Sequence, residues 1–188
     1  MSVRYFEYFP NATFNGVLVT DITKRVNIYD TVLSDPYAFL PYTIESADRP
    51  EDIALFYYGD VTYVWLVYFS ILAIDPYYDW PLQQRQFEKF IIKKYKEESG
   101  EEIDSAVLAW TQNTQISDNI VHYKSVTDDT IISKDSYTLN PLIDGDEWTA
   151  IRYYDHEEEL NENKRVIELL DRRYAAQAEN QLKELLNV

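Results

Sequence analysis

The chain has 188 residues, a hydrophobic content of 46% and a net charge of −16, from 17 basic and 33 acidic residues. This is enough apolar material for one domain or two small ones, whereas the negative charge disfavours nucleic acid and anionic membrane surfaces as partners. Cysteine is absent, which excludes disulfides, thiolate metal sites and cysteine nucleophiles, and favours a reducing compartment.

The first 40 residues are rich in aromatic side chains and lack helical spacing. The Asn15-Gly16 pair is a turn signal before the β-branched run at 17–19, and prolines at positions 36 and 41 disfavour a helix. We therefore expect residues 1–40 to form an extended N-terminal arm with a few short strands. Its aromatic side chains need cover from their own domain or from another chain, and they include Tyr5, Phe6, Tyr8, Phe9 and Phe14.

Residues 41–98 are expected to form one domain with a following helix. An alternating, β-prone segment at 42–45 predicts its first strand. A helix is predicted next, with Asp48 as its N-cap, Pro50 in its first turn and Gly59 at its left-handed end. One face of this helix is expected to carry apolar side chains at positions i, i+3 and i+4, namely Ile53, Phe56 and Tyr57.

A second helix is predicted at 61–72, where apolar side chains point in nearly every direction. The apolar run at 61–74 spans 14 residues, whereas a membrane helix needs about 20, so a buried helix is expected. Such a helix cannot show a face to water. In so short a chain, we expect a surface shared with another chain to cover part of it.

An aromatic turn follows at 75–81, where two prolines exclude a helix and three aromatic side chains lie within four residues. Residues 82–97 return to helical spacing, with Phe87 and Ile91 on the apolar side. The helix-breaking segment at 99–102 is the predicted domain boundary.

Residues 99–188 are predicted to form a β-rich segment that ends in a C-terminal helix. Turns at Asp128-Asp129 and Asp144-Gly145 separate β-prone runs that are expected to be strands, at 106–111, 120–125, 130–133, 148–154 and 165–170. Asp171 is expected to cap the final helix, whose apolar side chains recur at spacings of three or four. The whole pattern indicates an α+β fold.

The sequence offers no positive sign of catalysis, of a cofactor or of a metal. Its four glycines lie more than 40 residues apart, so they cannot build a glycine-rich phosphate-binding loop. His122 and His156 lack the pattern of a metal site or of a Ser-His-acid triad. The acidic run beside His156 could hold a divalent cation weakly, but a solvated turn is expected there. Asp144 opens a segment that lacks the later Glu of a calcium loop.

Material suited to protein interfaces is abundant, with 17 Tyr, 8 Phe and 4 Trp. Tyr and Trp join a large apolar body to a polar tip, which suits surfaces that become buried on assembly. The alternative is that these rings fill the chain's own core, although cores more often use Leu, Ile, Val and Phe. The tyrosine bias therefore favours a binding function.

Seven segments carry a resemblance to a known family. They are residues 5–15 (YFEYFPNATFN), 21–26 (DITKRV), 35–43 (DPYAFLPYT), 49–59 (RPEDIALFYYG), 63–68 (YVWLVY), 75–82 (DPYYDWPL) and 160–170 (LNENKRVIELL). In this order, over nearly the whole chain, they resemble the LysM-like baseplate wedge subunit of contractile-tailed bacteriophages, the base plate wedge protein 53 family. The stretch at 105–147 is the least characteristic.

The resemblance implies a structural protein of the virion tail baseplate, assembled in the host cytoplasm. Its implied partners are other wedge proteins, neighbouring wedges and the central hub or tube. It also implies a LysM-like strand–helix–helix–strand core at about 42–82. Glycan-binding LysM modules carry a Gly-Asp-Thr loop after the first strand, whereas this chain has Ser46-Ala47-Asp48-Arg49-Pro50. The likeness is therefore expected to concern the fold, and peptidoglycan is not expected as a partner.

The leading hypothesis is a non-enzymatic protein that joins wedge subunits around the hub, without membrane insertion, nucleic acid, cofactor or metal. Its expected partner-contacting residues lie in the arm, the aromatic turn and the 161–165 segment, and they are Tyr5, Phe6, Phe9, Phe14, Asp75, Pro76, Tyr77, Tyr78, Trp80, Asn161, Lys164 and Arg165. Lys164 and Arg165 are expected either to pair with carboxylates or to end a helix in solvent. The alternatives are a peptidoglycan-binding LysM-type module that stacks sugars on Tyr77, Tyr78 and Trp80, and a hydrolase.

Overall fold

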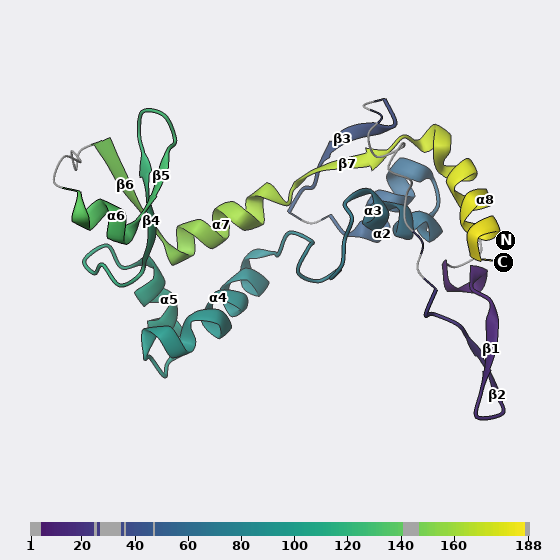
Figure 1. Ribbon diagram of the computed structural model, residues 1–188, viewed down its shortest axis with the longest axis horizontal. Coiled ribbons are helices and arrows are strands. Elements are labelled where there is room, and N and C mark those ends of the chain that lie inside the picture. Colours follow the sequence, from purple (N-terminus) through teal and green to yellow (C-terminus); the bar gives the residue numbers. More distant parts are fainter. Residues whose placement is uncertain are drawn as a thin grey trace. The chain divides into compact units, whose positions relative to one another are not determined.

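The computed structural model describes residues 5–186, except 25, 27–34, 36, 47 and 141–146. It is a mixed helix and sheet fold, as the sequence predicts, and it divides into two compact units (Figure 1). The first, which we call the terminal unit, comprises the described residues within 1–80 and 165–188, and the second, the central unit, comprises those within 81–164. No helix of the described part of the chain combines the length and apolar character needed to cross a membrane.

Two strands far apart in the sequence form a sheet in the terminal unit. β3 (Phe39–Thr43) pairs antiparallel with β7 (Val166–Leu170), as Figure 1 shows. The ladder extends one step further, because the backbone N–H of Ile44 donates to the carbonyl of Arg165 at 2.8 Å. β3 lies a few residues before the strand expected at 42–45, whereas β7 confirms the strand expected at 165–170.

A helical segment follows β3. α2 (Pro50–Ile53) continues directly into a π-helical segment, η2 (Ala54–Tyr58). Gly59 ends this segment in the left-handed conformation, with φ of 85°, as predicted. A residue with a Cβ is strained at that φ, which explains why glycine stands there.

Two expectations for this helix are wrong. Arg49, not Asp48, occupies the N-cap position. The Asp48 carboxylate instead accepts hydrogen bonds from the Tyr42 hydroxyl on β3 and from the N–H of Glu45. Phe56 does not share the buried face of Ile53, since the Phe56 side chain is 85% exposed. The π-helix has a wider turn than the 3.6-residue spacing used for the prediction, and this rotates the later residues to another side.

The second helical segment is η3 (Val61–Tyr63) followed by α3 (Val64–Ser70), in place of the single helix expected at 61–72. The middle of α3 is buried, and its remaining residues are half-buried. The chain itself therefore covers the middle of this apolar helix but not all of it, and the expected contact with another chain stays a prediction.

The other elements of the terminal unit lie near the two ends of the chain. They are η1 (Tyr5–Tyr8), β1 (Asn11–Phe14), β2 (Val17–Thr20), η5 (Arg172–Tyr174) and α8 (Ala175–Leu186). β1 and β2 form a hairpin whose turn is at Asn15-Gly16, as predicted, and β2 contains the β-branched run at 17–19. Asp171 caps η5 through its carboxylate, which confirms its predicted place at the start of the C-terminal helix.

The central unit combines helices with a three-stranded antiparallel sheet of order β5-β4-β6 (Figure 1). Its elements are α4 (Gln84–Ser99), α5 (Asp104–Gln112), β4 (Ile120–Ser125), β5 (Ile131–Ser133), α6 (Lys134–Leu139), β6 (Trp148–Arg152) and α7 (Tyr153–Asn163). The strand expected at 120–125 is present with the expected bounds. The helix expected at 82–97 and the strands expected at 130–133 and 148–154 are present with shifted bounds. The turn expected at Asp144-Gly145 lies outside the described residues.

Helices occupy all of one predicted β segment of the central unit and the end of another. α5 occupies the strand expected at 106–111, and it buries Val107 and Thr111, four residues apart, on one helical side. α7 begins inside the strand expected at 148–154. α6 was not expected at all, because six residues of mixed polarity carry little periodic signal.

The bounds of the two units differ from those of the three predicted segments, 1–40, 41–98 and 99–188. The division into these three segments stays a prediction. The strand–helix–helix order expected at 42–82 is present, but the strand that pairs with β3 is β7. The polypeptide of the central unit is therefore inserted between α3 and β7.

Candidate functional site

Aromatic rings of the N-terminal segment pack against α3. The Tyr5 ring lies 5.2 Å from that of Phe9 and 5.9 Å from that of Trp65, between centroids, and it stacks on the latter. Phe9 is buried in the same core cluster as Trp65, whereas Phe6 is exposed. The segment is thus docked on its own unit and leaves the Phe6 ring in solvent.

A carboxylate on α8 holds this segment in place. Glu179 accepts hydrogen bonds from the hydroxyls of Tyr8 at 2.8 Å and Tyr63 at 2.9 Å, and from Lys183 Nζ at 2.7 Å. The bond from Lys183, with those from the two tyrosines, lowers the pKa of the Glu179 carboxyl. Burial and the hydrogen bond to Glu179 raise the pKa of Tyr63 to about 12. Glu179 thereby ties η1, η3 and α8 together.

The aromatic turn after α3 is held by two of its own carboxylates. Asp75 accepts a hydrogen bond from the N–H of Tyr77 at 2.9 Å, and Asp79 accepts one from the N–H of Ile74 at 2.8 Å. The side chains of Ile74, Tyr77 and Tyr78 are 95%, 52% and 42% exposed. The turn therefore presents apolar surface on a backbone that its own hydrogen bonds fix.

Trp80 anchors this turn on the core. Its half-buried ring packs against the cluster that contains Ile44, and lies 6.4 Å from the Tyr68 ring. The indole Nε1–H donates to the Asp48 carbonyl at 3.4 Å. Pro76, in contrast, is exposed.

Asn161, on α7, is buried within the central unit. Its Oδ1 accepts from the N–H of Leu82 at 2.7 Å, and its Nδ2 donates to the carbonyl of Leu82 at 3.0 Å. The Asn161 side chain thus satisfies both the backbone N–H and the carbonyl of Leu82, as a neighbouring strand would. Lys164 and Arg165 are half-buried, and their expected pairing with partner or internal carboxylates stays a prediction.

The structure groups these predicted residues into separate surfaces. Tyr5, Phe6 and Phe9 form one aromatic cluster, and the residues from Asp75 to Trp80 form one turn. Phe14 belongs to a third surface, on the β1–β2 hairpin. The hairpin exposes several apolar side chains that the sequence reasoning did not single out, namely Val17, Leu18 and Val19. The signal that was available is the run of uncharged residues at 10–20 in a highly charged chain.

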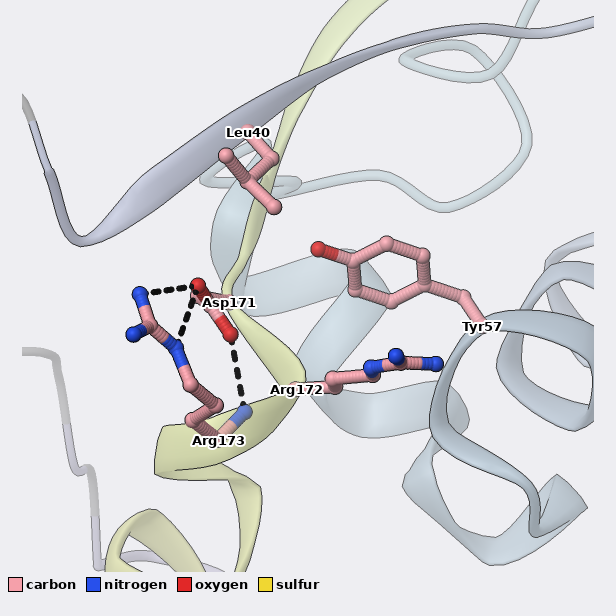
Figure 2. A pocket seen from close by; sticks show the side chains of 5 residues that line it. All are labelled: Leu40, Tyr57, Asp171, Arg172 and Arg173. Atoms are coloured by element: carbon pink, nitrogen blue, oxygen red, sulfur yellow. Dashed lines mark hydrogen bonds and ion pairs between the residues drawn. The ribbon is translucent and has the colours of Figure 1, made fainter.

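A pocket of about 340 Å³ was also missed. Its lining residues are Leu40, Tyr57, Asp171, Arg172 and Arg173 (Figure 2). The Arg173 guanidinium donates two hydrogen bonds to the Asp171 carboxylate, at 2.7 and 2.9 Å, and these lower the pKa of that carboxyl. The ion pair with Arg173 balances the negative charge of Asp171. Arg172 therefore gives the pocket an excess positive charge. Two adjacent arginines in an acidic chain were the available signal.

The two histidines lie close to each other in the central unit. The rings of His122 on β4 and His156 on α7 are 5.4 Å apart between centroids and perpendicular. Burial, followed by the neighbouring His156, lowers the pKa of His122. Among the described residues, no three His, Asp or Glu side chains gather in a way that could hold a metal ion. The segment at Asp144 lies outside those residues.

Comparison with known proteins gives two matches. A family model described as base plate wedge protein 53 matches residues 2–184. Over 101 residues, the chain is 28% identical to the baseplate wedge protein gp53 of Enterobacteria phage T4. The aligned residues make up 54% of this chain and 52% of that protein. The chain thus spans about half the length of this curated relative.

Proposed function

Since the chain belongs to the base plate wedge protein 53 family, we propose that it joins wedge subunits around the central hub of a phage tail baseplate through protein–protein contacts. The family makes it a structural protein of the virion tail baseplate. The match over residues 2–184 is the observation that carries the proposal. Neighbouring wedges and the hub or tube are the proposed partners.

We assign the main contact surface to the aromatic turn. Asp75, Pro76, Tyr77 and Tyr78 are exposed, together with Ile74. An exposed tyrosine pair on a prearranged backbone suits a binding hot spot, because little conformational freedom is lost when it docks. The net charge of −16 favours partner faces that are neutral or basic.

The remaining predicted residues fall into two groups. Phe6, Phe14, Lys164 and Arg165 have side-chain surface to offer a partner. The others are assigned a positioning role, because packing or hydrogen bonds within their own unit hold their side chains: Tyr5, Phe9, Trp80 and Asn161.

We also propose that the LysM-like core consists of β3, the α2–η2 helix, α3 and β7. The antiparallel pairing of β3 with β7, and the two helical segments of the same unit that follow β3, support this assignment. The likeness concerns the fold, because the loop at 46–50 differs from that of glycan-binding modules.

The proposal is tested with a double variant, Tyr77→Ala with Tyr78→Ala. The full chain is co-expressed with the other wedge proteins of its phage, and its binding to them is measured after purification. We expect the variant to weaken binding by about 2 kcal/mol, or roughly 30-fold, as loss of an interface hot spot does.

The matched control is Tyr37→Ala, since Tyr37 is also a surface tyrosine of the terminal unit. It is expected to bind as the wild type does. Wild-type protein that ignores all wedge proteins, yet is retained on purified peptidoglycan sacculi, would overturn the proposal in favour of a glycan-binding module.

A further inference from the structure

The backbone of the β1–β2 hairpin has hydrogen-bonding groups along its outer edges. The N–H of Asp21 donates to the carbonyl of Pro10 at 2.8 Å, so these two residues form a hydrogen-bonded pair. Bonded and non-bonded pairs alternate in an antiparallel ladder, and the register pairs Leu18 with Thr13 between two bonded pairs. The backbone groups of Leu18 and Thr20 on β2 therefore point outward, as do those of the residues opposite them on β1.

Those outward groups form no hydrogen bond to another described residue. The hairpin is a separate two-stranded sheet, and a sheet of two strands is marginally stable in water by itself. Its turn is well formed, with φ of 49° at Asn15 and 77° at Gly16, the values that match a twisted hairpin. The hairpin is thus shaped as a template for a further strand.

One face of the hairpin is apolar and open to solvent. Phe14 lies opposite Val17, and Ala12 lies opposite Val19, so these four side chains share a face. The three larger side chains of this face are exposed: Phe14 by 68%, Val17 by 61% and Val19 by 39%. An added strand would enlarge this face and supply apolar side chains beside it.

The hairpin also lacks the usual protection against edge pairing. Residues 10–20 carry no charge, although 27% of the chain is charged. Exposed edge strands in soluble proteins are commonly guarded by lysines, inward-pointing charges, bulges or prolines. Neither strand contains a proline, and Pro10 lies just before the first.

We propose that β2 is a strand-addition site, at which an extended segment of another baseplate subunit pairs with the edge at Leu18 and Thr20. β2 is the better edge, because β1 begins with Asn11, a residue disfavoured in strands. The pairing would satisfy the outward backbone groups and cover the apolar face. This inference rests on the proposed function.

The occupant is a strand with apolar side chains at alternate positions and basic or neutral flanks. Asp21 follows β2 directly, and the chain carries a charge of −16. Those charges attract basic flanks and oppose a second copy of this chain. A different subunit is therefore the better partner.

The first test is amide hydrogen exchange of the wild-type full chain, alone and within a wedge assembled from co-expressed wedge proteins. We expect the amides of Leu18 and Thr20 to exchange at least about tenfold more slowly in the wedge. Incorporation without this protection overturns the strand-addition site and leaves the proposed function standing. Failure to incorporate at all overturns the proposed function.

The second test blocks one edge at a time. Leu18→Pro removes an outward N–H from β2 without removing a hairpin bond, and Thr13→Pro does the same on β1. We expect Leu18→Pro to weaken incorporation by roughly tenfold, and Thr13→Pro to match the wild type. Equal loss in both variants, or a free chain that dimerises with Leu18 protected, overturns the proposal.

Discussion

Trp80 and Tyr77 belong to the same aromatic turn but have different surroundings. Tyr77 projects into solvent beside Tyr78, whereas Trp80 is half-buried against the core and donates to the Asp48 carbonyl. Composition could not separate them, because both are amphipathic aromatic residues suited to interface or core. Burial, which depends on the chain that packs around each ring, decides between the two uses.

We predict that Trp80→Ala destabilises the chain by about 2–3 kcal/mol, because it removes a large, partly buried ring. Urea unfolding of the full chain measures the effect. The control, Tyr77→Ala, removes an exposed ring and is expected to change stability by less than about 0.5 kcal/mol. Equal stability of the two variants would contradict the anchoring role of Trp80.

Single elements were predictable where their own residues decide their structure. The turn at Asn15-Gly16, the helix end at Gly59 and the cap at Asp171 are local features, and the structure contains each of them. α5 was mistaken for a strand, because its β-prone residues are helical in response to tertiary packing. The π-helical turn that exposes Phe56 has no recognised sequence pattern.

The packing of η1 on α8 could not be predicted from local sequence patterns either. It depends on Glu179, which meets Tyr8 and Tyr63 across long sequence separations. In the candidate site, the aromatic turn could be predicted from the sequence. The pocket at Arg172 could not, because Leu40 and Tyr57 line it from distant parts of the chain.

We predict that Glu179→Gln destabilises the chain by about 1–2 kcal/mol at pH 7, because charged hydrogen bonds become neutral ones. The folded-state pKa of Glu179 is lowered from 4.5, so the carboxylate's contribution is complete above that value and is lost as the pH falls through the folded-state pKa. Unfolding measured from pH 7 to pH 3 should therefore show the wild type converging on the variant. A gap that stays constant with pH would contradict this role.

At the scale of the whole molecule, each hydrophobic core cluster of the described residues belongs to one unit. The core clusters around Leu66 and Ile44 use residues of the terminal unit, and the cluster around Ile91 uses residues of the central unit. A unit with its own core is expected to fold by itself. The long connection between β3 and β7 is therefore a topological insertion, which a reading of local sequence patterns could not reveal.

We predict that the terminal unit keeps its fold when residues 81–164 are replaced by a Gly/Ser linker of about ten residues, which spans roughly 17 Å. Its two core clusters and the β3–β7 ladder are complete without those residues. The expected result is a cooperative thermal unfolding transition by circular dichroism, and protection of the Ile44 amide in hydrogen exchange. The fragment 81–164 alone serves as the reciprocal case. If the linked terminal unit lacks both cooperative unfolding and Ile44 protection, the two strands need the central unit to find each other, and the division into independently folding units is wrong.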